Sequence, residues 1–345
     1  MGFTKAAIAR LFASYDLSVS LSDLVDKARG ILYNPFSIFM ECERRKRMHA
    51  ITTNHLTKYY GKSRGIIDIH LSVEEGDFFG FIGPNGAGKS TTIRTLLGLI
   101  TATSGSAEIF GKDVEKNKTA VLAEIGYLPS ETMFYSGMQV KDILRLSGDL
   151  RGKDCSAETK RLCDRLALDA SRKIDALSLG NRKKVGIVCA MQHRPKLYIL
   201  DEPTSGLDPL MQREFYALLK ERNAEGATVF LSSHVLSDVQ RYCRHAAVIR
   251  EGKLLACDSV ENLGHTGARR VTLRGISEPP DLVQIRDVKI SSEAVSFLYS
   301  GKPGVLLKAI ADLPITDITI GEPDLEEVFM HYYREEEERN DNLSI

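Results

Sequence analysis

The feature that most constrains this chain is a run that fits the pattern G-x-x-x-x-G-K-[ST], namely Gly83-Pro84-Asn85-Gly86-Ala87-Gly88-Lys89-Ser90. An apolar run at 78–82 precedes it, and apolar residues at helical spacing, Ile93, Leu96 and Leu97, follow it. This order predicts a strand, a loop whose backbone amides face phosphate oxygens, and a helix. Lys89 then supplies positive charge to the β- and γ-phosphates, and the Ser90 hydroxyl is a ligand for Mg²⁺. A plain glycine-rich turn is the competing interpretation, which the flanking strand and helix disfavour.

A second run places two carboxylates at the end of an apolar strand. Residues 197–200 are apolar, and Asp201 and Glu202 follow them directly. Open α/β sheets bind their ligands at the carboxyl ends of the strands, so we expect these acids beside the phosphate loop. Asp201 would then hold Mg²⁺ through water, and Glu202 would polarise the attacking water. An Asp-Glu pair that caps a helix is the alternative, which the pairing with the phosphate loop disfavours.

Composition excludes several classes of protein. Of the 345 residues, 43% are hydrophobic and 27% are charged, which is enough material for a buried core. The 46 basic and 46 acidic residues balance, which disfavours a basic face for nucleic acid. The six cysteines are scattered without a C-x-x-C pair, a pattern typical of a reduced cytosolic chain. No apolar run reaches the roughly 18 residues of a membrane span, so a membrane role is expected only through a partner.

The chain separates into regions by composition. Residues 51–260 alternate short β-rich runs with helical patterns, as in an α/β domain, and the runs on either side of Glu251-Gly252 predict a hairpin. Residues 266–333 hold alternating runs and then a helical pattern, which predicts a small α+β appendage. One face of that last helix would be apolar, formed by Leu325, Val328, Phe329, Tyr332 and Tyr333. At the start of the helix, Asp324 and Glu327 have the spacing of a capping box. We therefore assign residues 1–47 to an N-terminal extension and residues 48–262 to a cassette domain. Residues 266–335 are assigned to an accessory domain, and residues 336–345 to an acidic tail.

Together, the ordered motifs resemble the ATP-binding cassette (ABC) family over about residues 51–260. Leu177-Ser178-Leu179-Gly180-Asn181 is similar to the family's signature, Leu-Ser-Gly-Gly-Gln. Asp208 is similar to the D-loop aspartate, and His234, after the predicted strand at 228–232, is similar to the switch histidine. Tyr60 matches the aromatic residue that stacks on adenine, and Thr91 is a further ATP contact by the same resemblance. Through residues 322–329, the appendage is less specifically similar to that of cassettes serving two-component exporters.

This resemblance implies the architecture and the partners. The expected fold is α/β, a P-loop NTPase nucleotide-binding domain of the ABC type with a helical subdomain inserted at about 131–195. Two cassettes form a head-to-tail sandwich, with ATP and Mg²⁺ between the P-loop of one and the signature of the other. Ser178 and the Gly180 amide would contact the γ-phosphate across that interface, and Glu202 and His234 would be catalytic. A permease on a separate chain, at the inner face of the cell membrane, is the other implied partner, and no nucleic acid is implied.

Three positions depart from the family pattern. Leu179 stands where glycine is usual, which confines the backbone to negative φ, and Asn181 shortens the reach of the usual glutamine. Ser130, in Tyr127-Leu128-Pro129-Ser130-Glu131, replaces a glutamine that usually touches Mg²⁺ and couples the helical subdomain to the permease. We expect Ser130 to ligate the metal directly or through water, and Glu131 is the alternative.

Three functions compete at this point. The leading one is the ATP-hydrolysing subunit of an ABC transporter, an exporter in view of the appendage, that powers a separate permease. A soluble cassette ATPase acting on DNA or ribosomes is disfavoured, because such relatives carry a coiled coil or a second cassette and the net charge here is zero. A GTP switch or small-molecule kinase leaves the signature, Asp208 and His234 unexplained. Drugs, antimicrobial peptides and lipids all remain open as the transported substrate.

The start of the chain also leaves alternatives open. Met48 stands where such a cassette ordinarily starts. If the source is bacterial, the purine-rich codons of Arg44-Arg45-Lys46 could be a ribosome-binding site that has been translated as protein. Residues 1–47 would then be an artefact of an upstream start. The alternatives are a helical extension that packs on the core and a basic amphipathic segment that touches a membrane surface. The intact mass of the natively expressed protein decides, since a chain that retains residues 1–47 excludes the artefact.

Overall fold

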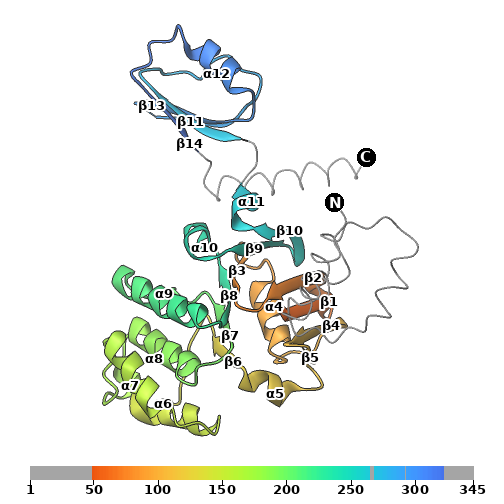
Figure 1. Ribbon diagram of the computed structural model, residues 1–345, viewed down its shortest axis with the longest axis vertical. Coiled ribbons are helices and arrows are strands. Elements are labelled where there is room, and N and C mark those ends of the chain that lie inside the picture. Colours follow the sequence, from red (N-terminus) through yellow and green to blue (C-terminus); the bar gives the residue numbers. More distant parts are fainter. Residues whose placement is uncertain (1–48, 265–267, 292, 322–345) are drawn as a thin grey trace, which may run out of the picture. The chain divides into compact units, whose positions relative to one another are not determined.

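The computed structural model describes residues 49–264, 268–291 and 293–321 (Figure 1). The chain divides into two units, 1–48 and 49–345, and every described residue belongs to the second. The expectations for residues 1–47, for the helix at 324–333 and for the tail at 336–345 lie outside the described residues. In the described part, the strands are β1 (His49–Tyr60), β2 (Ser63–Glu74), β3 (Phe78–Ile82), β4 (Ser104–Ile109), β5 (Lys112–Asp113), β6 (Ile125–Leu128), β7 (Leu197–Asp201), β8 (Thr228–Ser233), β9 (His245–Arg250), β10 (Lys253–Ser259), β11 (Arg269–Arg274), β12 (Ile285–Ile290), β13 (Ala294–Tyr299) and β14 (Asp317–Gly321). The helices there are α4 (Lys89–Leu96), α5 (Lys118–Ala123), α6 (Val140–Asp149), α7 (Ser156–Arg165), α8 (Leu179–Met191), α9 (Pro209–Ala224), α10 (Leu236–Tyr242), α11 (Val260–Gly264) and α12 (Pro303–Ile310), with a 3-10 turn, η1, at Ile174–Ala176.

A six-stranded sheet in the order β10-β9-β3-β8-β7-β6 positions the site. The strands β9, β3, β8, β7 and β6 pair in parallel, so their carboxyl ends lie along one edge of the sheet. β9 and β10 form the predicted antiparallel hairpin, in which Glu251 and Gly252 both have positive φ. Segments that leave the five parallel strands therefore lie along the same edge of the sheet, although the strands are far apart in the sequence.

Strand β7 separates two hydrophobic cores. Tyr198 and Leu200 face the core that α6 to α10 cover, whereas Leu197 and Ile199 face the core built on α4 and the antiparallel sheet β2-β1-β4-β5. Successive side chains of a strand point to opposite faces, so a strand buried on both faces needs an unbroken apolar run. This is the physical reason why the run at 197–200 predicts a central strand.

The helices α6, α7 and α8 lie between β6 and β7 in the sequence and group together on one side of the sheet (Figure 1). Their apolar faces pack on one another, with Ile143 and Leu144 of α6, Leu162 of α7 and Val188 of α8 in one core. They fall in the interval 131–195 where helices are expected, and residues 131–139 precede the first of them. No helix in the described ranges is long and apolar enough to cross a membrane.

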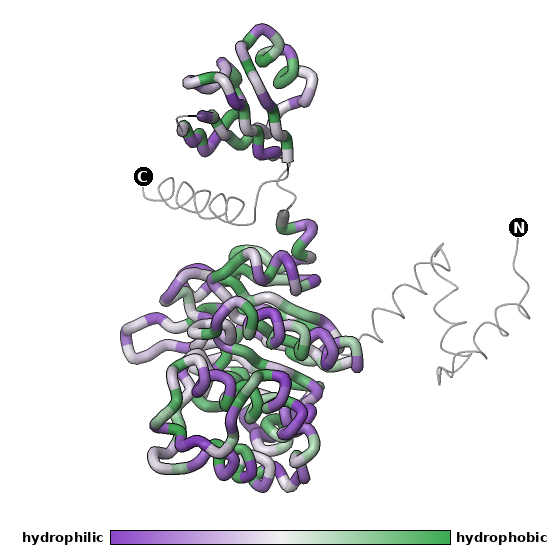
Figure 2. Tube along the Cα trace, turned by 90° about the vertical axis from the view of Figure 1, so that its left-hand side faces the viewer, coloured by the Kyte–Doolittle hydropathy of each residue, from purple (hydrophilic) through white to green (hydrophobic). Residues whose placement is uncertain are grey.

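A second antiparallel sheet, in the order β12-β13-β11-β14, follows in residues 269–321. This part of the chain mixes hydrophobic and hydrophilic residues (Figure 2), and burial alternates along β13, so that one face carries a small core that includes Val271, Phe297 and Leu306 of α12. The alternating runs in the sequence predict β12, β13 and β14, whereas β11 and α12 are additional elements. The described part of the predicted appendage therefore contains both a sheet and a helix.

Candidate active site

The phosphate loop joins β3 to α4, as the motif predicts. Gly88 is the N-cap of α4 and has φ of 111°, and a Cβ there would lie 2.9 Å from Cγ2 of Ile66, so only glycine fits this position. The buried Lys89 ammonium donates hydrogen bonds to the carbonyl oxygens of Gly83 (2.6 Å) and Pro84 (3.2 Å). The loop thus wraps a positive charge at the start of a helix, an arrangement suited to phosphate groups.

Asp201, at the end of β7, lies directly beside the loop. Its Oδ2 accepts a hydrogen bond from Ser90 Oγ at 2.8 Å, and its Oδ1 accepts one from Ser232 Oγ at 2.6 Å. Both carboxylate oxygens are therefore held in fixed orientation at a buried position. The hydroxyl of Ser90 and the carboxylate of Asp201 are hard oxygen donors of the kind that Mg²⁺ prefers, so this donor set fits that ion.

Glu202 carries its carboxylate between a lysine and a histidine. Its Oε1 lies 3.2 Å from Lys89 Nζ, and its Oε2 lies 2.6 Å from Nδ1 of the exposed His234. The carboxylate is only 17% exposed, and Oε1 is buried without a hydrogen bond. The backbone of Glu202 has φ of 47°, a region that costs a non-glycine residue about 1 kcal/mol or more and that occurs preferentially at functional sites. The end of β7 is therefore bent so that this carboxylate faces the loop.

Lys183 is a residue of this site that the sequence analysis did not single out. Its side chain, 2% exposed, extends from α8, and Nζ donates to the carbonyl oxygens of Pro129 (3.0 Å), Ser130 (2.8 Å) and Glu202 (3.2 Å). Burial lowers the pKa of Lys183 to about 8, against the opposing effect of the nearby Asp201 and Glu202 charges. One signal was available in the sequence: Lys183 lies on the same face of its helix as the apolar Ile187.

The signature residues start helix α8. Ser178 is the N-cap, and its Oγ accepts hydrogen bonds from the backbone N (3.4 Å) and Nδ2 (3.1 Å) of Asn181. Gly180 packs closely, since a Cβ there would lie 2.7 Å from the carbonyl oxygen of Gly206. Leu179 is in the helix, where negative φ is normal, and its side chain is 68% exposed. Leucine at this position therefore imposes no backbone strain.

The remaining predicted residues lie at several places around the loop. Asp208 is the N-cap of α9, and its Oδ1 accepts from the backbone N of Leu210 (3.1 Å) and Met211 (3.0 Å). Tyr60 ends β1 and is exposed, and Ser130 follows β6 and is half-buried. Pro84, Asn85 and Gly86 are exposed at the tip of the loop, Ala87 is buried beneath it, and Thr91 is half-buried in α4, whereas Glu131, the alternative to Ser130, is exposed.

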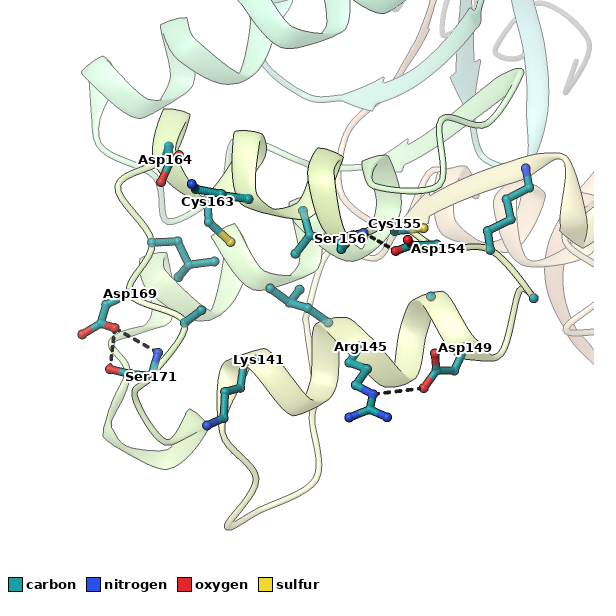
Figure 3. Close-up of a pocket in the computed structure, with 18 residues that line it drawn as sticks. Lys141, Arg145, Asp149, Asp154, Cys155, Ser156, Cys163, Asp164, Asp169 and Ser171 are labelled. Carbon is teal, nitrogen blue, oxygen red and sulfur yellow. Dashed lines mark hydrogen bonds and ion pairs between the residues drawn. The ribbon is translucent and has the colours of Figure 1, made fainter.

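A hollow of about 990 Å³ lies elsewhere, among α6, α7 and the segment 168–171 (Figure 3). Its wall carries both charges: Lys141 and Arg145 come from α6, and Asp164 and Asp169 come from α7 and the segment after it. The residues of the phosphate loop and of the ends of β7 and β8 are absent from its lining. The hollow is therefore a separate surface feature and does not belong to the nucleotide site.

Together, the parallel sheet, the phosphate loop and the two acids after β7 define a P-loop nucleoside triphosphatase. Residues 66–205 match the family model described as ABC transporter. The chain is 35% identical to the bacitracin transport ATP-binding protein BcrA of Bacillus licheniformis over 81% of this chain and 96% of that protein. It is 28% identical to the linearmycin resistance ATP-binding protein LnrL of Bacillus subtilis over 81% of this chain and 97% of that protein. A solved ATP-binding subunit of an ABC transporter superposes with a TM-score of 0.59 at 30% identity, over 62% of this chain and 91% of the other.

The chain belongs to the family of ABC transporter ATP-binding proteins. It is an ABC transporter ATPase, and the resemblance inferred from its motifs is confirmed.

Proposed function

We propose that this ATPase drives export through a separate permease, with Glu202 as the base that activates the attacking water. The observation that carries the proposal is the position of the Glu202 carboxylate, between Lys89 and His234 and beside the Ser90–Asp201 pair. Oε1 of Glu202 makes an ion pair with Lys89 but accepts no hydrogen bond, so it keeps lone pairs that can accept a water proton.

Each residue has a task in the hydrolysis of ATP. Ser90 and Asp201 would hold Mg²⁺, which when bound neutralises charge on the β- and γ-phosphate oxygens. Lys89 binds the same phosphates from inside the loop, and the loop amides orient them. Glu202 accepts the proton of the attacking water, and His234 fixes the orientation of the Glu202 carboxylate through the bond at Nδ1. Ser130 is proposed as a further metal contact, and Tyr60 as the surface on which adenine stacks.

A second cassette completes the site in this proposal. Ser178 and the backbone of Gly180 start a helix of 13 residues, whose N-terminus favours the negative γ-phosphate of the opposite cassette. The close packing of Gly180 on Gly206 supports it, because it joins the signature to the segment that contains Asp208. Hydrolysis of the ATP bound by the opposite cassette would therefore affect the signature and the Asp208 segment together.

The names of the relatives support the class of transported substrate. BcrA is named for bacitracin transport and LnrL for linearmycin resistance. This chain aligns with nearly the whole length of both proteins. An antibiotic or a similar amphipathic molecule is therefore the proposed cargo. The proposed place of action is the cytoplasmic face of the membrane, reached through the permease.

Two substitutions test the chemistry. Glu202→Gln keeps the shape of the side chain but removes its capacity to accept a proton, so ATP hydrolysis should fall by roughly 10²–10⁴-fold. ATP binding should survive, and the protein should accumulate as an ATP-bound dimer in size-exclusion chromatography with Mg²⁺-ATP. Lys89→Ala, the control, should lose ATP affinity and stay monomeric. Turnover of Glu202→Gln near the parental rate would remove Glu202 from this role and point to His234.

A further inference from the structure

Three exposed side chains of the β1–β2 hairpin, none of them assigned to the nucleotide site, converge on one another. His55 Nδ1 lies 2.7 Å from Asp68 Oδ1 and 2.9 Å from His70 Nε2, and the third side of the triangle, His70 Nε2 to Asp68 Oδ1, measures 3.5 Å. All three side chains are exposed, by 74%, 61% and 49% for His55, Asp68 and His70. Three potential ligand atoms thus surround one point that solvent can reach.

Hydrogen bonding accounts for the two short contacts of this triangle only through one shared proton. A proton on His55 Nδ1 that bonds to Asp68 leaves no lone pair there to accept from His70 Nε2, which lies 2.9 Å away. A proton on His70 that bonds to His55 instead leaves a lone pair of Nδ1 facing a carboxylate oxygen at 2.7 Å. Both short contacts are hydrogen bonds at once only if His55 Nδ1–H donates to Asp68 Oδ1 and to an unprotonated His70 Nε2 together, whereas one cation accepts a lone pair from each of the three atoms.

The triangle also has the size of one face of a coordination shell. Imidazole nitrogen and carboxylate oxygen bind Zn²⁺ at about 2.0–2.2 Å, which separates neighbouring ligand atoms by roughly 3–3.5 Å in tetrahedral or octahedral geometry. The observed separations of 2.7, 2.9 and 3.5 Å need only side-chain adjustments of a few tenths of an ångström. The side chains are exposed, and the two imidazole rings contact each other edge to face, so small rotations suffice for such adjustments.

The hairpin backbone is distorted at two of the three residues. The β1–β2 register shifts on both sides of the Leu56–Ile69 pair, once next to His55 and once next to Asp68. Both residues have positive φ, 49° for His55 and 55° for Asp68. Such irregularities re-aim side chains that would otherwise follow the alternation of a regular strand. Here they turn His55 toward Asp68 and His70, which share one face of β2.

We propose that His55, Asp68 and His70 form a binding site for a divalent transition-metal ion. Two imidazoles and one carboxylate favour Zn²⁺, Ni²⁺, Co²⁺ or Cu²⁺ over Mg²⁺, which prefers oxygen ligands such as those near Ser90. The exposed side leaves the other coordination positions to water or to a group from another molecule. The bound ion would cross-link β1 to β2 next to the two register shifts and so stabilise the hairpin.

Calorimetric titration of the untagged full-length chain with Ni²⁺, without nucleotide, tests the proposal. A Cys257→Ser background removes an exposed thiol that also binds metals. The parent should bind one equivalent, and His55→Ala and His70→Ala should each weaken that binding at least about tenfold, since loss even of an outer partner costs 10–100-fold. His49→Ala is the matched control, because His49 lies on the same hairpin but bonds to Ser72 instead.

A second measurement separates a metal site from a role of these residues in folding. Co²⁺ should give the parent and His49→Ala a visible d–d absorption band that His70→Ala lacks, although all three give the same circular dichroism. Asp68→Asn should also weaken Ni²⁺ binding while it keeps the size of the side chain. Absence of stoichiometric binding by the parent, or equal affinity of His55→Ala, His70→Ala and the parent, would overturn the proposal.

Discussion

At the residue scale, Glu202 combines an unusual backbone with a shared carboxylate. Sequence analysis predicts that Asp201 and Glu202 lie beside the phosphate loop, because an apolar strand followed by acids is a local pattern. It does not predict the positive φ of Glu202 or the bond to His234, which depend on β8 as the neighbouring strand. The role of Ser232 was missed for the same reason, since its contacts with Asp201 and Glu202 cross between strands.

Ser130 takes the place of the usual glutamine, and its carbonyl oxygen already accepts a bond from Lys183. Its hydroxyl is then the group available for Mg²⁺, so Ser130→Ala should weaken Mg²⁺-dependent hydrolysis and leave metal-free nucleotide binding nearly intact. A Mg²⁺ titration of the ATPase rate measures this. Glu131→Ala is the control. If only Glu131→Ala weakens Mg²⁺-dependent hydrolysis, Glu131 and not Ser130 is the metal ligand.

Lys183 connects the segment after β6 to the segment after β7 through three carbonyl oxygens. Lys183→Met keeps most of the side chain's length but removes every donor, and unpaired buried acceptors cost about 1–3 kcal/mol each. We expect kcat for ATP to fall by roughly tenfold or more, while KM changes little. The reason is that a displacement of the Glu202 carboxylate by about 1 Å is sufficient for such a loss of rate. Steady-state kinetics measures both values, with Lys184→Met as the control. An unchanged kcat, or a rise in KM alone, would contradict the positioning role.

At the element scale, apolar runs identify the buried strands well. The strands β3, β7 and β8 appear in the sequence with nearly their observed bounds, because burial on both faces demands continuous apolar residues. β11 was missed because arginine stands at both of its ends, and α12 because it is only eight residues long. The division into 48–262 and 266–335 stays a prediction.

His193, which follows α8, contributes a pH-dependent term to stability. Burial, with Arg151 nearby, lowers the pKa of His193 to about 4, and its Nε2 bonds to the carbonyl oxygen of Ile125 in β6 (3.1 Å). The unfolded chain binds the proton near pH 6.5, but the folded chain does so only near pH 4. The contribution of His193 to the free energy of unfolding is therefore fully present above pH 6.5 and is lost as the pH falls through 4. Between pH 7 and 5 the loss amounts to about 2 kcal/mol.

His193→Gln removes the titration but keeps a side-chain donor. Its urea unfolding midpoint should consequently fall less between pH 7 and 5 than that of the parent. An equal fall in both proteins would assign the pH dependence to other groups.

At the scale of the whole molecule, the resemblance predicts the cassette and a helical subdomain at about 131–195 that meets the permease, but not which side chains make that contact. The segment after Ser130 exposes two large apolar side chains, Met133 by 89% and Tyr135 by 76%. We propose the permease as its partner, because exposed large apolar side chains are suited to a contact with another protein.

Tyr135→Glu tests this surface. The charge should weaken association with the permease by roughly 30-fold, the effect of a loss of about 2 kcal/mol at a central contact, and leave basal ATP hydrolysis within about twofold. Co-purification of the two chains measures the change. Val283→Glu, at a fully exposed position in the C-terminal part, is the control. Unimpaired co-purification of Tyr135→Glu would place the contact elsewhere.

The order of strands in the central sheet also determines when the enzyme is assembled during synthesis. β3 ends at Ile82, but its neighbours β8 and β9 begin only at Thr228 and His245. At roughly 5–20 residues per second, translation takes on the order of 7–30 s to supply β8 after β3 has been made. During that interval the apolar strand Phe78–Ile82 has both edges unpaired, a state that favours aggregation. Until β8 and β9 have been synthesised, this strand can therefore be covered only by transient local packing or by another molecule.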